Sequence, residues 1–266
     1  MSSKIEPERN VRWAELTGPE IGAAGSAGAL AVIPLGCTEQ HGMHLPVDTD
    51  TYQVERLAIA SAAEATRRGV QILVLPTLPF GPASEHHGFA GTISLDSGAY
   101  MQVVKDLVRS VLDSGFSRIA VIHGCGGHWV VPGALWDAKA EAARAKKKLV
   151  LRQIGFDREW HRLQRAVFPD SGDSSAGHAG VMETALCMST REHLVRLDLY
   201  RTPAVDRLDR RYHRLGEVFL FSEISDTGAL GDAAGATAAA GSRLWDQQIA
   251  WLAQLFADLA IEDGCL

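Results

Sequence analysis

Acids and histidines gather between residues 39 and 50, directly after an apolar run at 29–35. Glu39 and His41 are two residues apart, and Asp50 lies where the next helical pattern starts. This spacing brings two carboxylates and one imidazole within reach of a single point above a strand end. Carboxylate oxygen and imidazole nitrogen together suit a divalent ion such as Zn²⁺ or Mn²⁺. A polar loop followed by a helix cap explains the same residues without a metal, so the rest of the sequence has to decide.

Histidines are concentrated in a few loop-like segments. Seven of the ten lie in four such segments, namely His41, His44, His86, His87, His123, His128 and His178. Three of the four segments directly follow predicted strands. Because the carboxyl ends of parallel strands meet at one edge of a sheet, these loops are expected to converge there.

The second segment is the glycine-rich loop at 81–92, which carries Ser84, Glu85 and His86. Glycines allow a backbone to approach a ligand closely, but the loop matches no phosphate-binding motif. It is either a structural turn or the wall of a substrate pocket.

The remaining two segments add further candidate ligands. His123, Cys125 and His128 stand among glycines at the end of the third predicted strand, and a surface turn has little need of these three types. His178 and Glu183 are five residues apart where a helix begins. They share the site if His178 lies in the loop before that helix; a helix cap and a solvated glutamate are the alternative.

Strand-like and helix-like segments alternate along the chain. Apolar runs predict strands at 29–35, 71–75, 118–122 and 148–154, and helical periodicity predicts helices at 51–68, 101–112, 130–146 and about 233–261. Thr49 or Asp50 is the expected cap of the first of these helices. The alternation predicts an α/β protein with a mainly parallel sheet, helices on both faces, and ligands bound outside the carboxyl ends of the strands.

Composition limits the function further. The 266 residues are 46% hydrophobic and show no linker-like break, which favours one domain over 1–266. A net charge of −6 argues against nucleic acid or an anionic membrane as partner and favours a small-molecule or peptide substrate. Neither a signal peptide nor a membrane-spanning run is recognisable, so we expect a cytoplasmic protein. The four cysteines lack paired spacing and fit reduced thiols.

The order and spacing of these motifs resemble the creatininase-like metal-dependent amidohydrolases over about the whole chain. The matching segments are 34–42 with Leu45, Pro46 and Asp50, then 84–86 through 91–94, the glycine turn at 124–127, 178–180 with Glu183 and Thr184, and the late stretch 228–241. The resemblance implies a three-layer α/β/α fold, two divalent ions bridged by an aspartate and a water, and often a hexamer built as a trimer of dimers. Members of this family open cyclic amides, remove formyl groups or trim a peptide, and one branch cleaves a ring ketone of inositol-type sugars.

Most site residues follow from this resemblance. Glu39, His41 and Asp50 match metal ligands of the family, with Asp50 in the bridging position. Glu183 matches a frequent acidic ligand, and His178 matches the histidine beside the substrate.

The third loop departs from the family pattern. Relatives usually carry Asn-Gly-His-Gly-Gly-Asn there, so Cys125 stands where a metal-binding histidine is expected. A thiolate binds Zn²⁺ well and Mn²⁺ poorly. Either Cys125 is a metal ligand and the site has become more zinc-like, or His123 or His128 supplies the missing imidazole.

We therefore expect a hydrolase with two divalent ions per chain, Zn²⁺ or Mn²⁺ with Fe²⁺ as an alternative, acting on a small cyclic amide or related carbonyl compound. A metal-bridging hydroxide is the expected nucleophile, and His178 the expected proton donor to the leaving group. The expected substrate pocket consists of Ser84, Glu85, His86, His128 and Trp129. Two alternatives stay open: a hydrolase that cleaves a C–C bond of a cyclic β-dicarbonyl or 3-dehydro-inosose-type compound, and a catalytically weak metal-binding member of the family.

The last predicted helix, 233–261, has more apolar residues than one buried face needs. With the family precedent, this favours a homo-oligomer, although packing within the chain explains the pattern about as well.

Overall fold

The computed structural model describes residues 11–155, 158–169, 177–204 and 218–261. In chain order the elements are η1 (Trp13–Glu15), α2 (Gly18–Ser26), β1 (Leu30–Leu35), α3 (Thr49–Arg67), β2 (Ile72–Val74), η2 (Ser84–His86), α4 (Ser97–Asp113), β3 (Arg118–His123), α5 (Val131–Arg144), β4 (Val150–Ile154), α6 (Arg158–Val167), α7 (Val181–Arg191), η3 (Glu192–Leu194), α9 (Phe221–Ile224) and α10 (Ala238–Ile261).

The four strands form one parallel sheet in the order β2-β1-β3-β4. β1 and β3 pair along their whole length, from Leu30 with Arg118 to Leu35 with His123. Every residue of β1 is buried. A strand covered on both faces needs apolar residues without alternation, which is why this segment reads as a continuous apolar run in the sequence.

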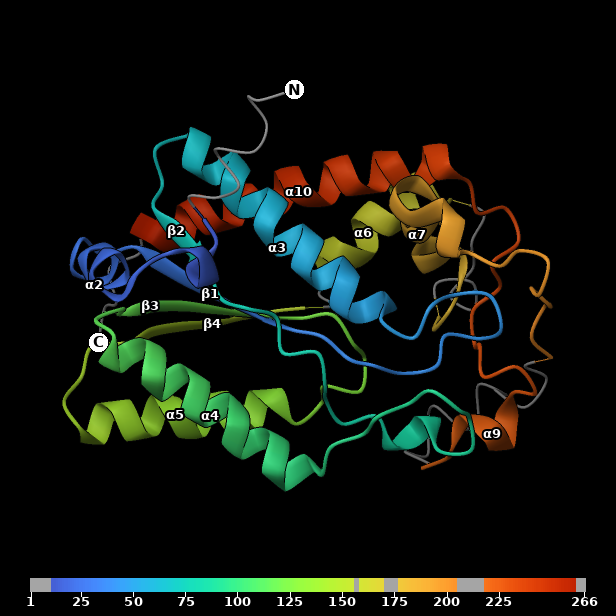
Figure 1. Cartoon of the computed structure of the whole chain (residues 1–266), viewed down its shortest axis with the longest axis horizontal. Coiled ribbons are helices and arrows are strands. Elements are labelled where there is room, and N and C mark those ends of the chain that lie inside the picture. Colours follow the sequence, from blue (N-terminus) through green and yellow to red (C-terminus); the bar gives the residue numbers. More distant parts are fainter. Residues whose placement is uncertain (1–10, 156–157, 170–176, 205–217, 262–266) are drawn as a thin grey trace.

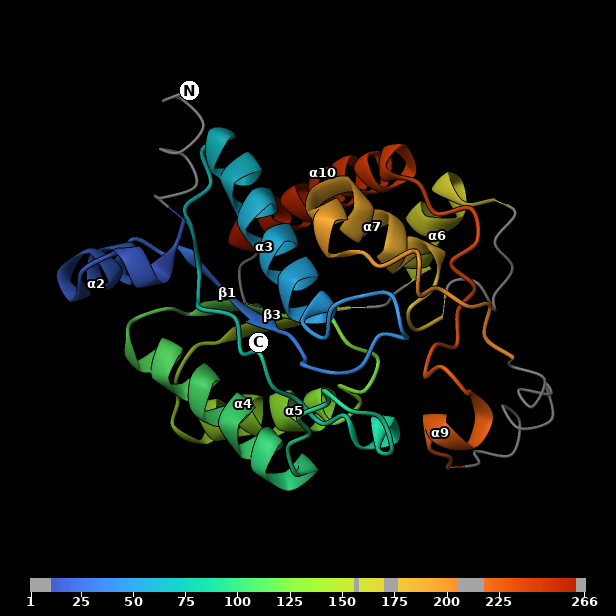
Figure 2. The ribbon, with the colours of Figure 1, turned by 45° about the vertical axis from the view of Figure 1, so that its right-hand side comes forward.

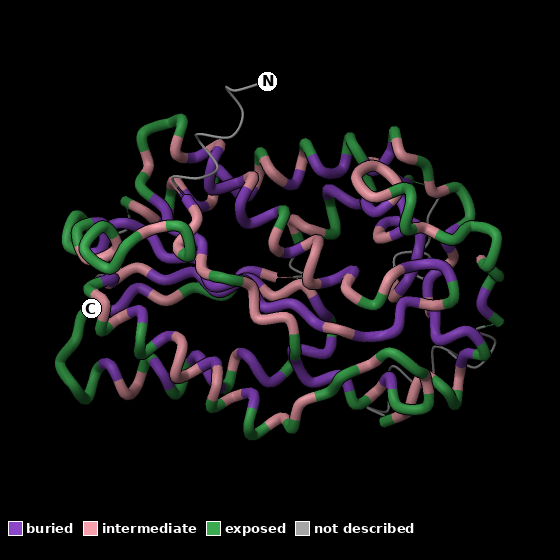
Figure 3. Tube along the Cα trace, in the orientation of Figure 1, coloured by how far each residue is buried: buried purple, intermediate pink, exposed green. Residues whose placement is uncertain are grey.

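Helices cover both faces of the sheet (Figures 1 and 2). Leu30 and Val32 face a core shared with α3, α6, α7 and α10. Ala31 and Ile33 point the other way, into a core shared with α2, α4 and α5. The buried stretches run through the middle of the molecule between these layers (Figure 3). The predicted three-layer α/β/α architecture is confirmed.

Helix α3 corrects one prediction. It begins at Thr49, with Asp48 in the N-cap position, so neither Thr49 nor Asp50 is the cap. The Thr49 hydroxyl donates to the Pro46 carbonyl at 2.6 Å and thereby closes the preceding loop. Asp50 lies inside the first turn, where its carboxylate is buried and available for a site.

Packing within the chain explains the apolar pattern of α10. Leu244, Leu252, Phe256 and Leu259 are buried in the core on the α3 side of the sheet. Ile249 and Leu255 are partly buried against the same core. Among the described residues, no helix is both long and apolar enough to span a membrane.

Gly241 permits the close contact of α10 with α7. A Cβ at this position would lie 1.9 Å from the Ala185 carbonyl oxygen. We expect Gly241→Ala to lower the free energy of unfolding by about 1–3 kcal/mol, because the helices must separate to relieve the overlap. Urea unfolding measures the change. Gly22→Ala in α2 is the control, since its Cβ would meet nothing within 4 Å and alanine favours a helix. Equal stability of the two variants would contradict this account of the packing.

Candidate metal centre

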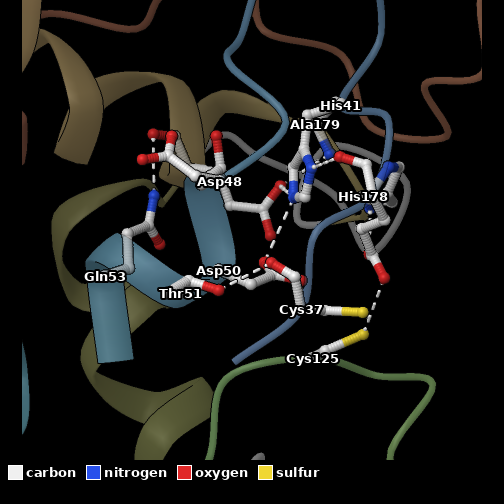
Figure 4. A network of polar contacts seen from close by, with 12 residues as sticks. Cys37, His41, Asp48, Asp50, Thr51, Gln53, Cys125, His178 and Ala179 are labelled. Carbon is white, nitrogen blue, oxygen red and sulfur yellow. Dashed lines mark hydrogen bonds and ion pairs between the residues drawn. The ribbon is translucent and has the colours of Figure 1, made fainter. Parts of the chain in front are cut away.

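The loops that follow the strands bring the predicted ligands together at the carboxyl edge of the sheet. Figure 4 shows three of them, His41, Asp50 and Cys125, in one network of polar contacts. Glu39 and His41 come from the loop after β1, Asp50 from the first turn of α3, Cys125 from the loop after β3, and Glu183 from the first turn of α7. Among these five ligands, two groups of three have possible ligand atoms within 4.8 Å of one another: Glu39 with Asp50 and Cys125, and His41 with Asp50 and Glu183. Asp50 belongs to both groups. A further group joins Glu39 and His41 with His178.

The tautomer of His41 follows from its contacts. Its Nδ1 lies 3.0 Å from the Glu39 carbonyl oxygen, so the Nδ1–H donates there. Nε2 faces Asp50 Oδ1 at 3.1 Å and Glu183 Oε2 at 3.9 Å. Burial disfavours a charged ring, but the two carboxylates prevail and raise the pKa of His41 well above its ordinary value. The position therefore attracts positive charge, which either a proton or a metal ion supplies.

Glu39 is held by several neighbours. Its Oε1 lies 3.1 Å from His86 Nε2 and 3.6 Å from His178 Nδ1, and its Oε2 accepts a hydrogen bond from the Cys125 thiol at 3.2 Å. Burial raises the pKa of Glu39, but the His86 hydrogen bond and the nearby imidazoles together hold it well below its ordinary value. Glu39 is therefore a carboxylate ready to bind a cation.

Gln40, which the sequence reasoning did not select, orients two histidines. Its Nε2 donates to His86 Nδ1 at 2.8 Å and to the Gly228 carbonyl at 2.9 Å, which leaves the His86 Nε2–H to donate to Glu39. The backbone carbonyl of Gln40 accepts a hydrogen bond from His178 Nε2 at 2.6 Å. In a neutral His178 ring, the nitrogen without a proton is therefore Nδ1. The position of Gln40 between Glu39 and His41 was the feature of the sequence that could have marked it as a site residue.

The remaining two carboxylates, Asp50 and Glu183, both carry raised pKa values; the Asp50 side chain is buried, and the Glu183 side chain is 12% exposed. Burial, opposed by His41 but reinforced by Glu39 and Glu183, raises the pKa of Asp50 to about 8. Its Oδ2 has no hydrogen-bond partner among the described residues. Burial likewise raises the pKa of Glu183, whose Oε2 accepts from the Ala179 N–H at 2.6 Å.

A bound cation would balance the negative charge of Glu39, Asp50 and Glu183. Within the described residues, no lysine or arginine forms an ion pair with Glu39, Asp50 or Glu183. Two buried carboxylates and a third that is only 12% exposed, without a lysine or arginine partner, are costly to fold. The unpartnered Asp50 oxygen, the mixed O, N and S donors and the two groups that share Asp50 all fit a pair of divalent ions.

Of the three side chains considered for the unusual loop, Cys125 is the one that reaches Glu39 and Asp50. A Cβ on Gly124 would lie 3.1 Å from the Asp50 carbonyl oxygen, so glycine lets this loop approach α3. His123 turns away, with Nδ1 3.4 Å from the Cys125 carbonyl and Nε2 2.9 Å from the Gln153 amide. His128 lies beside Cys125 but outside both groups.

A cavity of about 340 Å³ opens onto this centre. Of the predicted pocket residues, Glu85 and His86 line it, and Ser84, His128 and Trp129 do not. Ser84 is exposed beside Ser94, His128 is buried behind Cys125, and Trp129 is 69% exposed on the surface. Three lining residues that sequence reasoning did not select are His161, Gln164 and Phe221, from α6 and α9.

The protonation of the centre makes the stability of metal-free protein depend on pH. Asp50, Glu183 and His41 have raised pKa values in the folded state, whereas the pKa values of His44, His123, His128 and His178 are lowered and oppose them until these histidines are neutral in both states. Above about pH 7.5 the folded protein therefore binds more protons than the unfolded chain, and we expect the melting temperature of chelator-treated protein to fall as pH rises from about 7.5 to 9. Zinc should reverse this trend, because deprotonated ligands bind it better. Thermal unfolding followed by circular dichroism tests this; a rising melting temperature without metal would contradict it.

Comparisons with known proteins place the chain in a family. The family model for creatininase, described as creatinine amidohydrolase, matches residues 14–256. The chain belongs to the creatininase family. It is 32% identical over 232 residues to the mycofactocin precursor peptide peptidase of Mycolicibacterium smegmatis, covering 83% of this chain and 81% of that protein. It is 27% identical to the creatinine amidohydrolase of Pseudomonas putida, covering 71% of this chain and 75% of that protein.

The fold agrees with solved creatininase structures. A mutant creatininase described as Zn–Zn type superposes with a TM-score of 0.81 at 21% identity, covering 95% of this chain and 99% of that one. This likeness supports the fold alone. The sequence matches establish that the chain is a creatininase-family hydrolase.

Proposed function

We propose that this creatininase-family hydrolase is a binuclear metal-dependent amidohydrolase that cleaves a C–N amide bond. The observation that carries the proposal is the pair of ligand groups that share Asp50. Glu39, Asp50 and Cys125 would hold one ion, and His41, Asp50 and Glu183 the other. The thiol favours zinc over manganese at the first position. Divalent ions in such a centre polarise a carbonyl group and lower the pKa of water.

His178 is suited to move the proton in this reaction. It lines the cavity, and its Nε2–H is fixed by the Gln40 carbonyl. Burial, together with the nearby charge on His41, holds the pKa of His178 well below its ordinary value, so the ring begins neutral. Nδ1 of His178 can take a proton from a water molecule while the oxygen of that water bonds to the carbonyl carbon of the substrate. The same proton then passes to the nitrogen as the C–N bond breaks. His178 thus accepts a proton before it donates one.

A peptide bond is the first candidate substrate. The relative at 32% identity over most of the chain is a peptidase, and the relative at 27% opens a cyclic amide. The cavity has room for a short peptide end as well as for a small ring. A cyclic amide is the second candidate.

A hydrolysis screen in ¹⁸O-labelled water tests the reaction class. Zinc-loaded protein is incubated with short peptides, creatinine, formamides and a 3-dehydro-inosose-type ketone, and products are read by mass spectrometry. We expect amide substrates to give a carboxylate that carries one labelled oxygen, and we expect chelation to abolish and zinc to restore the reaction. Cleavage of the ketone alone, or full activity of metal-free folded protein, would overturn the proposal.

We also propose that the chain forms a homo-oligomer, with a hexamer built as a trimer of dimers as the first expectation. Trp129 and Trp136 support an interface near the start of α5, because they are 69% and 76% exposed and large aromatic side chains are enriched in interfaces. Light scattering tests this, and a monomer at micromolar concentration would exclude it.

A further inference from the structure

A second group of soft donors lies beside the proposed binuclear centre. Cys37, Cys125 and His128, which we call the thiol pocket, have possible ligand atoms within 4.8 Å of one another. All three are buried, with exposures of 0%, 3% and 1%. Figure 4 shows the two sulfur atoms side by side, with Cys37 reaching in from the end of β1 and Cys125 from the loop after β3. Two loops, the one after β1 and the one after β3, thus bring two thiols and an imidazole close together.

The His128 ring has one nitrogen without a hydrogen-bond partner in the described part of the chain and one beside a polar neighbour. Its Nδ1 is buried and has no hydrogen-bond partner among the described residues. Its Nε2 lies 3.4 Å from the Tyr100 hydroxyl, and the two rings stack with centroids 5.4 Å apart. Metal-bound histidines commonly have one nitrogen on the ion and the other on a polar neighbour that fixes the ring. Gly81 makes room for this orientation, because a Cβ there would lie 2.4 Å from Nε2.

The surroundings match the donors. The thiols are in contact with Ala83, and no carboxylate belongs to the group. Two sulfurs and one nitrogen suit thiophilic ions with filled d shells and suit Mg²⁺, Ca²⁺ or Mn²⁺ poorly. Small thiols alone could serve to fill the core, but packing gives no reason for a buried imidazole nitrogen without a partner.

We propose that the thiol pocket is a third metal-binding site, which takes a thiophilic d¹⁰ cation such as Zn²⁺ or Cd²⁺ and shares Cys125 with the binuclear centre. In metal-free protein, binding one divalent ion would release the thiol protons of Cys37 and Cys125 to solvent as two metal–sulfur bonds form; where the first ligand group already holds an ion on Cys125, only the Cys37 proton would be released. Because Cys125 Sγ also lies 3.2 Å from Glu39 Oε2, an ion in the thiol pocket acts directly on the first ligand group. The pocket itself does not depend on the proposed reaction; only the sharing of Cys125 rests on it.

Cadmium titration of the full chain, stripped of metal and kept reduced, tests the site. Thiolate-to-cadmium absorption in the ultraviolet reports sulfur ligands, and elemental analysis reports the ions bound. We expect about three Cd²⁺ per chain, with absorption from two thiolates. Cys37→Ser should lose one ion and about half of the absorption, and His128→Asn should weaken the same ion at least about tenfold. Cys187→Ser is the control and should change neither, since Cys187 contacts Gln53 and lies outside the pocket.

Asp50→Asn separates this proposal from the proposed function. If both are right, that variant loses ions of the binuclear centre but keeps the absorption from two thiolates. If wild-type protein binds fewer ions but Cys37→Ser still removes the sulfur signal, the binuclear centre fails and the thiol pocket stands. Unchanged absorption and metal content in Cys37→Ser would overturn the thiol pocket. Should the variants not fold, ¹¹³Cd NMR of the wild type decides, because a site with two sulfurs and one with a single sulfur differ widely in chemical shift.

Discussion

Asp50→Asn is expected to remove most of the bound metal and to lower turnover more than roughly 100-fold. This loss is larger than the roughly 10- to 100-fold loss of metal affinity or activity that follows when a residue that only positions a metal ligand is changed. Asp50 belongs to both ligand groups, so its replacement weakens both ions at once. The amide retains the size of the side chain but loses its negative charge. Elemental analysis and steady-state kinetics measure the two effects on the same preparation.

Asp48→Asn is the matched control, because the same change is made two residues earlier. The Asp48 carboxylate forms a bidentate pair with Arg191 at 3.0 Å and belongs to neither ligand group. We expect this variant to keep its metal and its turnover. If Asp50→Asn retains two ions per chain, Asp50 is not a bridge and the centre is organised differently.

His178→Asn is expected to lower kcat by roughly 10²–10⁴-fold with no change in metal content. The reason is that His178 lines the cavity with a bare Nδ1 and does not belong to either ligand group that shares Asp50. His193→Asn, at an exposed position in η3, is the control and should retain wild-type kinetics.

Metal content decides between two roles for His178. Its ring also lies near Glu39 and His41, with ligand atoms within 4.8 Å of each other. If His178→Asn loses one ion together with its activity, the imidazole is a metal ligand and the proton must be moved by another group. Retained metal with wild-type kcat would remove His178 from the mechanism altogether.

The sequence predicts the sheet and the edge at which the site forms. The runs at β1 and β3 are continuous and apolar because both faces of these strands are covered. Their parallel pairing brings the loops that carry Glu39 and Cys125 to the same edge. Helix ends were harder to place: α3 starts at Thr49 because a loop contact with Pro46, and not a capping side chain, sets its first turn.

Side-chain direction is what sequence could not provide. His123 and Cys125 are two residues apart in one glycine turn, yet only Cys125 points toward Glu39. The His123 ring instead forms a hydrogen bond with the side-chain amide of Gln153 on β4. Trp129 follows the same turn but lies on the surface. Helices α6 and α9, which complete the cavity, carry no ligand motif that would have marked them.

The hydrogen bond from Gln40 to the Gly228 carbonyl spans 188 residues of the chain. His178 and Glu183 likewise meet Glu39 and His41 only after more than half of the protein has been made. On the ribosome, the strand β1 and its loop therefore emerge long before their partners, and the early carboxylates have no complete site to join. Contacts of this range form late in folding. Loading of the proposed metal centre should accordingly wait until the chain has been made past Glu183 and has folded back onto the loop after β1.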